Sequence, residues 1–396
     1  MNLTIDIFSI IFILGALQGI FLSIVLFTRY RKSKANIYLA WLILSYSVFL
    51  VQQLLSGIEQ LSRNYPHFLM ILMGLPFLFG PLHLMYISVL TDSRIKFARL
   101  HWLHFVPFIL FKIYYLQVFF LSKEELNNII MQVEQNNPPL HLLISGVAVA
   151  VQGLIYVIVA LFVFREYLQK IKLTFSTIEK INLNWLKYFT IMALFVWIIV
   201  FVEEISRIIS IDTGAISFLV PVLTSIFVYA TGYIGMFKTE IFQQYDIYNN
   251  IHAIQDMTVA FNSSREEIDT TSKYQKSGLS PEKADEYLNR LKKLMEEDEI
   301  YTNPDITLKD LSEHLDTSTH NISEVINTRL NQNFFDFINR YRIEKVKKDL
   351  LDKSKEHYTL FAIAVDAGFN SKSGFNAIFK RYTGKTPSEF RNTLQQ

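Results

Sequence analysis

The sequence predicts an all-α protein in two halves: a bundle of seven transmembrane helices, then a helical linker and a small helical domain. The 396 residues are 51% apolar and 19% charged, with a mean hydropathy of +0.24, whereas soluble domains carry about 25% charged residues. The long apolar stretches all precede residue 240. We therefore expect a membrane half at 1–238, an acidic cytoplasmic linker at 239–300 and a C-terminal domain at 301–396.

Seven stretches approach or reach the length of about 20 apolar residues that a membrane helix needs. Five contain no charged residue, the fourth contains Lys112, and the sixth ends in Glu203, Glu204 and Arg207. The expected spans are Ile7–Phe27, Ile37–Ile58, His67–Thr91, Leu100–Leu121, Leu140–Phe164, Lys187–Ile209 and Gly214–Phe237.

The charges of the loops predict the orientation of the spans, because cytoplasmic loops collect Lys and Arg. The loops after the first, third and fifth spans carry 11 of these residues, whereas the opposite loops carry only Arg63 and Lys123. We therefore expect the N-terminus outside and the C-terminal domain inside. The first span lacks a basic leader and a small-residue cleavage site, so we interpret it as a span and not as a signal peptide.

The ionisable residues within the expected spans allow two interpretations, because such residues are costly in a bilayer and face a bundle interior. Arg207 follows Glu203 and Glu204 by one helical turn and can pair with them, and Lys112 could pair with Glu203 across the bundle. These four residues form either a structural ion-pair network or an outward-facing pocket for a small polar or amphipathic ligand.

Several classes of function are not predicted by any pattern in the sequence. The chain has no Cys, which excludes disulfides, thiolate metal sites and Cys nucleophiles. It also lacks a phosphate-binding loop, an HExxH pair and the glycine pattern of kinases. We therefore expect no enzyme activity, no cofactor and no metal site.

One short apolar pattern precedes the C-terminal domain. Ala284, Tyr287, Leu291 and Leu294 recur at the a and d spacing of a coiled coil over two heptads, fewer than such a prediction requires. This seam is either the contact of a homodimer or the inner face of a helix that packs on its own neighbour.

The C-terminal residues predict two helix-turn-helix units that are joined by a long helix. In the first unit, Thr307 begins a helix, Asp316 ends it, and Ser318 or Thr317 begins the next. A long helix follows at 334–353. The second unit repeats the pattern, with Gly368 in the turn and Ser371 at the start of its second helix.

The second unit carries a recognisable motif. Residues 363–391 read IAVDAGFNSKSGFNAIFKRYTGKTPSEFR, which resembles the signature of AraC/XylS-type transcription regulators. The resemblance covers about the last 95 residues, and Asp316 stands where the family often has Gly. The whole layout resembles membrane-anchored regulators of this family from Bacteroidetes-type bacteria. The resemblance therefore implies a multi-pass protein of the bacterial inner membrane with its DNA-binding domain in the cytoplasm.

The resemblance further implies which residues contact double-stranded DNA. The base-reading residues are Thr319, His320, Ser323 and Glu324 in the first unit and Lys372, Ser373, Asn376 and Ala377 in the second. The cations that suit phosphate contacts are Lys353, Lys380, Arg381 and Lys385.

These observations together predict a membrane-tethered, one-component transcription regulator that contacts DNA, membrane lipid and a small ligand at the bundle, with a homodimer as a further expectation. Two alternatives remain open. A transporter with a regulatory cytoplasmic domain would show inverted repeats, and a membrane adaptor would show no sequence-selective DNA binding.

Overall fold

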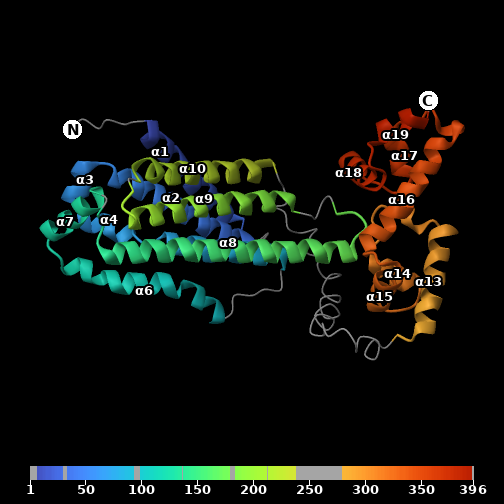
Figure 1. The fold of residues 1–396 in the computed structure, drawn as a ribbon, viewed down its shortest axis with the longest axis horizontal. Helices are drawn as coiled ribbons and strands as arrows, with labels where there is room; N and C mark the ends of the chain where they lie inside the picture. The colour runs from blue at the N-terminus through green and yellow to red at the C-terminus, as the bar shows by residue number, and fades with distance from the viewer. Residues whose placement is uncertain are drawn as a thin grey trace. The chain divides into compact units, whose positions relative to one another are not determined.

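A computed structural model describes residues 7–29, 34–92, 99–135, 137–178, 183–211, 213–237 and 279–394 (Figure 1). The described residues are helical apart from turns and one isolated antiparallel bridge. The chain divides into two compact units. The first holds Met1–Arg165 and Asn184–Tyr248, and the second holds Glu166–Leu183 and Asn249–Gln396. Most of the expected linker, 239–278, lies outside the described residues.

The first unit is a bundle of apolar helices. In this bundle α1 packs against α2 and α10, α2 also packs against α5, and α10 packs against α9. The elements of this part of the chain are α1 (Ile7–Thr28), α2 (Ala35–Ser56), α3 (Glu59–Asn64), α4 (Pro66–Leu72), α5 (Pro76–Thr91), η1 (Arg99–Phe105), α6 (Val106–Tyr115), η2 (Leu116–Phe120), α7 (Lys123–Glu134), α8 (Leu140–Thr174), α9 (Asn184–Ile208) and α10 (Gly214–Phe237).

Six helical stretches among the described residues are long and apolar enough to cross a membrane. They match the first six expected spans. The seventh expected span corresponds to α10, in which the apolar stretch Ile216–Thr231 is shorter. The third stretch is broken between α4 and α5, where Gly74 has a φ of +87°, a conformation that glycine adopts without steric cost. The helix of the fifth stretch, α8, extends ten residues beyond the expected end of its span, to Thr174.

Two glycines allow the first helices to approach closely. A Cβ on Gly15 would lie 2.9 Å from the Ser225 hydroxyl, and a Cβ on Gly19 would overlap the Ser47 hydroxyl. Small residues at such contacts let helix backbones come close together. The Gly15–Gly19 spacing is thus used for packing within the bundle.

The second unit contains the C-terminal helices and a short segment from the middle of the chain. Its elements after residue 278 are α13 (Pro281–Glu296), η3 (Ile300–Thr302), α14 (Leu308–His314), α15 (Thr319–Leu330), α16 (Phe334–Leu351), η4 (Lys353–Lys355), α17 (Leu360–Asp366), α18 (Lys372–Thr383) and α19 (Pro387–Leu394). One apolar core includes α14 and α15, a second includes α17 and α18, and α16 contributes to both.

The apolar seam before the C-terminal domain is buried by the chain itself. Leu291 is fully buried and Ala284 nearly so, and Tyr287 and Leu294 are partly buried against the same cores. The seam on α13 faces α15, which is the second of the two interpretations. It is therefore not a free surface for a homodimer, and α13 packs on the C-terminal helices.

Candidate nucleic-acid interface and a cavity in the helical bundle

The first helix-turn-helix unit consists of α14 and α15. The side chain of Thr307 accepts from the amide of Asp310 at 3.3 Å, and the Asp310 carboxylate accepts from the amide of Thr307 at 2.7 Å, which is the predicted capping box. In the turn, Asp316 has a φ of +48°. Asp therefore adopts here the left-handed conformation for which glycine is usual. Ser318, one of the two expected caps, accepts from the amide of Asn321 and begins α15.

The second unit repeats this design with α17 and α18. Gly368 has a φ of +97°, and a Cβ there would lie 2.6 Å from the carbonyl oxygen of Tyr301. Glycine is therefore required here both by the positive φ angle and by the lack of space for a Cβ atom. Ser371 accepts from the amide of Gly374 at 3.0 Å and begins α18, as predicted. In each unit, a helix of 7 residues precedes a recognition helix of 12 residues.

The expected base-reading residues on α18 are exposed. Lys372 and Ser373 lie in its first turn, and Asn376 and Ala377 lie in its second. The opposite face of the helix is buried through Phe375, Ile378 and Phe379. This face of α18 is therefore available to a DNA groove.

The corresponding residues on α15 are more enclosed. His320 is exposed, whereas Thr319, Ser323 and Glu324 are half-buried. The His320 Nε2 and Glu324 Oε2 atoms are 3.7 Å apart, and the Asn327 amide donates to the Ser323 hydroxyl at 3.2 Å. The structure thus holds three of these side chains in contacts along their own helix.

The four expected phosphate-binding cations differ in their surroundings. Lys353, Lys380 and Lys385 are exposed. Arg381 donates to the Asp336 carboxylate on α16 at 2.9 Å and lies over the Tyr382 ring. Its charge is therefore partly neutralised by the domain itself.

A titratable network surrounds this ion pair. The Tyr382 hydroxyl donates to the Asp336 carbonyl oxygen at 3.0 Å, and burial, together with the nearby Asp336 charge, raises the pKa of Tyr382 to about 12. Tyr382 is consequently a neutral hydrogen-bond donor at ordinary pH, and together with Arg381 it attaches the recognition helix α18 to α16.

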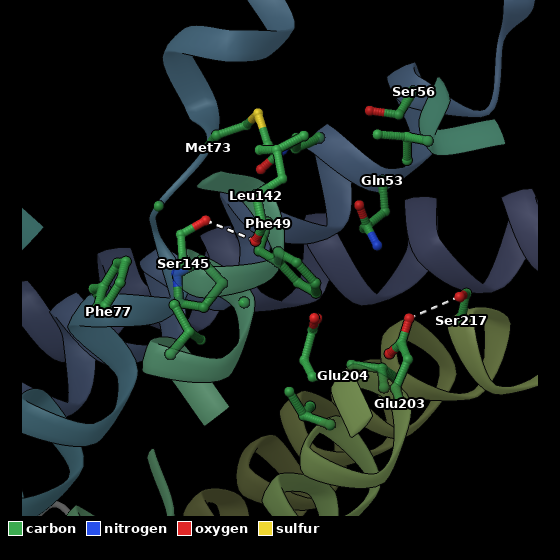
Figure 2. A pocket seen from close by; sticks show the side chains of 18 of the residues that line it. Phe49, Gln53, Ser56, Met73, Phe77, Leu142, Ser145, Glu203, Glu204 and Ser217 are labelled. Atoms are coloured by element: carbon green, nitrogen blue, oxygen red, sulfur yellow. Dashed lines mark hydrogen bonds between the residues drawn. The ribbon is translucent and has the colours of Figure 1, made fainter. Parts of the chain in front are cut away.

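A second candidate site lies within the helical bundle. A cavity of about 490 Å³ has mostly apolar and aromatic walls, to which Trp197 contributes, and its ionisable lining residues are Glu134 on α7 and a group on α9. Figure 2 shows Glu203 and Glu204 on α9 near Ser217 on α10. These three residues and Arg207 line the cavity.

The ionisable residues of α9 that line the cavity are connected to one another. Arg207 donates to the carboxylates of Glu203 and Glu204, the latter at 3.3 Å, as its helical spacing predicts. The Ser217 hydroxyl donates to Glu203 at 2.7 Å. Glu203 and Glu204 are only 6% and 8% exposed. One guanidinium thus faces two buried carboxylates, so this end of the cavity favours a positive charge or hydrogen-bond donors.

Two glycines of α8 make room for the walls of the cavity. A Cβ on Gly146 would overlap the Glu204 carboxylate, and a Cβ on Gly153 would overlap the Trp197 indole. The first turns of α8 also contribute Leu142 and Ser145 to the lining (Figure 2). No pattern in the sequence indicates this role, because isolated glycines in an apolar helix usually indicate close helix packing alone.

Lys112 does not belong to this group, and the expected pairing with Glu203 is wrong. It is not among the residues that line the cavity. Its ammonium group donates to the carbonyl oxygens of Ile71 and Met73, at 2.5 and 2.6 Å. These carbonyls are at the break between α4 and α5, where the backbone lacks helical partners. Lys112 therefore supplies hydrogen-bond donors to the carbonyl oxygens at the helix break and does not line the cavity.

The described residues contain no group of three or more His, Cys, Asp or Glu that could hold a metal ion. His104, at the start of the fourth apolar stretch, contacts the Tyr156 hydroxyl through Nδ1 at 2.7 Å.

Comparisons with known proteins concern the C-terminal region. A family model described as a helix-turn-helix domain matches residues 311–393. An uncharacterized HTH-type transcriptional regulator of Staphylococcus aureus strain COL is 33% identical over 93 residues, which are 24% of this chain and 12% of that relative. The transcriptional regulatory protein HptR of S. aureus is 32% identical over 85 residues, 22% of this chain and 32% of HptR. The matched region thus spans a third or less of these relatives.

Among solved structures, the C-terminal domain of AraT, a response regulator from Geobacillus stearothermophilus, is 26% identical. The match covers 30% of this chain and 88% of that chain, with a TM-score of 0.25. A protein of unknown function from Listeria innocua is 25% identical, and the match covers 27% of this chain and 94% of that chain, with a TM-score of 0.24.

Proposed function

Residues 311–393 form a helix-turn-helix domain of the AraC type, and from this premise we propose that the chain is a membrane-tethered, one-component transcription regulator. The observation that carries the proposal is the repeated unit of a capped 7-residue helix and a 12-residue recognition helix on either side of α16. The HTH-type regulators among the relatives support a DNA-binding, non-enzymatic role.

The geometry of α16 suits two contacts on one DNA face. Its 18 residues span about 27 Å at 1.5 Å per residue, somewhat less than the rise of one DNA turn, about 34 Å. We expect α15 and α18 to enter successive major grooves. Lys372 then donates to guanine, Asn376 pairs with adenine, and Glu324 accepts from cytosine. Exposed Lys380 and Lys385 contact the phosphates.

Selection from random DNA tests this function. Full-length protein in detergent micelles should enrich a site with two half-sites whose centres are about 10 base pairs apart. The control is a chain with Lys372→Ala and Asn376→Ala, which should lose preference in one half-site only. Enrichment of no sequence by the folded protein would contradict the regulator proposal and favour an adaptor.

We propose that the bundle spans the inner membrane of a bacterium with its N-terminus outside. The six long apolar helices, together with α10 as a seventh span, and the 11-to-2 distribution of loop cations support this topology. A periplasmic reporter fused after Gln135 should be active, and the same reporter at the C-terminus should be silent. Activity at the C-terminus would contradict the placement of the DNA-binding domain in the cytoplasm.

We further propose that the bundle cavity binds a small amphipathic ligand that enters from outside and is polar or basic at one end. The apolar wall and the Glu203–Arg207–Glu204 group support this assignment. A ligand changes the conformational equilibrium only through contacts that differ between states. Glu203→Gln and Glu204→Gln should therefore accumulate normally while transcription is fixed on or off. Normal levels with an unaltered response in both would contradict a ligand site.

A further inference from the structure

The second unit includes a segment that lies outside the matched helix-turn-helix domain. Residues 166–183 contain the last turns of α8 and the start of the connection to α9, yet they are grouped with the C-terminal helices. Within them, Phe175, Ser176, Thr177 and Ile178, hereafter the docking segment, follow directly after α8. Phe175 forms an antiparallel bridge with Thr307, the N-cap of α14. The docking segment is thus paired, through this one bridge, with the residue at which the first helix-turn-helix unit begins.

The polar groups of the docking segment form hydrogen bonds with the C-terminal domain. Ser176 is only 1% exposed, and its hydroxyl donates to the Ile306 carbonyl oxygen at 2.7 Å. The Thr177 hydroxyl donates to the Pro304 carbonyl oxygen at 2.8 Å. The Asn339 amide of α16 donates to the Ser176 carbonyl oxygen at 2.9 Å. These bonds are made in a buried place, where each polar group needs a partner.

A buried arginine depends on the same segment. Arg342 of α16 is fully buried, and its guanidinium donates to the carbonyl oxygens of Tyr301 and Asn303 at 2.8 Å. It also donates to the hydroxyls of Ser176 and Thr177 at 3.2 Å. Removal of the docking segment would take away two hydroxyl acceptors of this buried guanidinium, and the loss of hydrogen bonds to a buried charge is costly.

The docking segment contacts both halves of the DNA-binding domain. Ser176 and Thr177 bind the loop before α14, whereas Ile178 packs against the core that includes α17 and α18. The exposed base-reading residues Lys372 and Asn376 are not covered in this arrangement. The docked state is therefore compatible with DNA binding, and it fixes the two helix-turn-helix units against α16.

We propose that the surface formed by the loop before α14, by α16 and by the second core is a docking surface whose occupant is the Phe175–Ile178 segment of the same chain, and that docking sets the DNA-binding state. The segment directly continues α8, whose first turns supply Leu142, Ser145 and Gly146 to the bundle cavity. A single helix thus runs from the lining of the cavity to the docking segment. A change at the cavity can reach the DNA-binding domain along α8, a different route from the acidic linker. The effect on DNA rests on the proposed function, but the contact itself does not.

Disulfide trapping in the full-length chain tests the contact, because the chain has no native Cys. Bridge partners in antiparallel pairs have Cα atoms about 4.5–5.5 Å apart, within the range of a disulfide. Phe175→Cys with Thr307→Cys should oxidise rapidly in native membranes and give a monomer of altered mobility. The control, Phe175→Cys with the exposed Thr328→Cys, should not. No trapping above the control would overturn the proposal, and trapping only as dimers would overturn its intramolecular form.

The functional arm uses a variant outside the DNA-binding domain. Ser176→Arg places a second guanidinium beside Arg342, and it should lower affinity for the selected two-half-site DNA at least tenfold. Ser176→Ala keeps the backbone contacts and should change it less than threefold. The oxidised Phe175–Thr307 pair should bind at least as well as its reduced form. Unchanged affinity in Ser176→Arg would overturn the effect on DNA. If no DNA site is selected at all, the proposed function fails while the trapping result still decides the contact.

Discussion

The Asp336 carboxylate on α16 forms an ion pair with the Arg381 guanidinium on the recognition helix α18, at an O–N distance of 2.9 Å. The same residue accepts, through its carbonyl oxygen, the Tyr382 hydroxyl. The position of the second recognition helix relative to α16 is therefore set by side chains of two adjacent residues in its last turns. Since α16 carries both units, we expect this contact to affect the spacing at which the two recognition helices would meet DNA in the proposed function.

We expect Asp336→Asn to relax the spacing preference between half-sites by one or two base pairs. Its cost in stability should stay below about 1 kcal/mol, because Arg381 is about half exposed and solvent screens the pair. The measurement is selection from a library in which only the spacer varies. Glu344→Gln, which removes a pair with Lys347 inside α16, is the matched control and should leave the spacer profile as it is in the wild type.

Base reading by the two units can be separated. Asn376→Ala and Lys372→Ala should each cost about 1–3 kcal/mol at one half-site, and Thr319→Ala and His320→Ala should affect the other. Lys385→Ala should weaken binding to all sequences alike and reduce the salt slope by about one. An unchanged site profile for Asn376→Ala would show that α18 is not placed in the groove as proposed.

The room at Gly146 gives a test of the cavity that alters no charge. Gly146→Ala should displace the Glu204 carboxylate, because the added Cβ would overlap it, and should change the basal output of a reporter gene at normal protein level. Gly57→Ala is the control, since its Cβ would meet only ordinary contacts at 3.5 Å or more. Equal outputs for Gly146→Ala and the wild type would argue that the position of Glu204 has no part in sensing.

Because the seam on α13 is buried, we expect a substitution in it to lower the stability of the C-terminal unit rather than to disrupt a dimer. Leu291→Ala should destabilise the DNA-binding unit by about 2–5 kcal/mol, as expected for a fully buried leucine. Lys293→Ala, whose side chain is 67% exposed, should have little effect. Pulse proteolysis of the full-length protein in urea distinguishes them. Equal resistance of the two variants would show that α13 is not packed on the domain.

The pair of Glu299 and Lys345 predicts a pH dependence. The 2.7 Å hydrogen bond from Lys345 lowers the pKa of Glu299. A lowered pKa in the folded state adds stability above the unfolded value, about 4.3, which is lost as pH falls through the folded value. Glu299→Gln should thus be less stable than the wild type at pH 7, by under about 1 kcal/mol because the side chain is about half exposed. The difference should shrink as the pH falls below the unfolded value and should be lost once the pH is below the lowered pKa of the folded state. A difference that grows with acid would contradict the assignment.

Local patterns in the sequence determined most of the elements. The helix starts at Thr307 and Ser371 and the turn at Gly368 follow from hydrogen bonds and backbone angles within a few residues, and such interactions depend only on neighbours in the chain. The family resemblance of residues 363–391 rests on the same local spacing. The pairing of Arg207 with Glu203 and Glu204 lies within one helical turn, so it too could be predicted.

Long-range contacts were decided by the tertiary structure alone. The expected depths of Lys112 and Glu203 in the membrane would allow them to pair. The helix break at Gly74 instead exposes carbonyl oxygens that accept hydrogen bonds from Lys112. The α13 seam had two possible partners, and the apolar surface of its own domain buries it. Nothing near Ser176 in the sequence indicates Ile306 or Arg342. Partners more than 100 residues apart are chosen by shape and by the need to satisfy every buried polar group, and both exist only once the chain has folded.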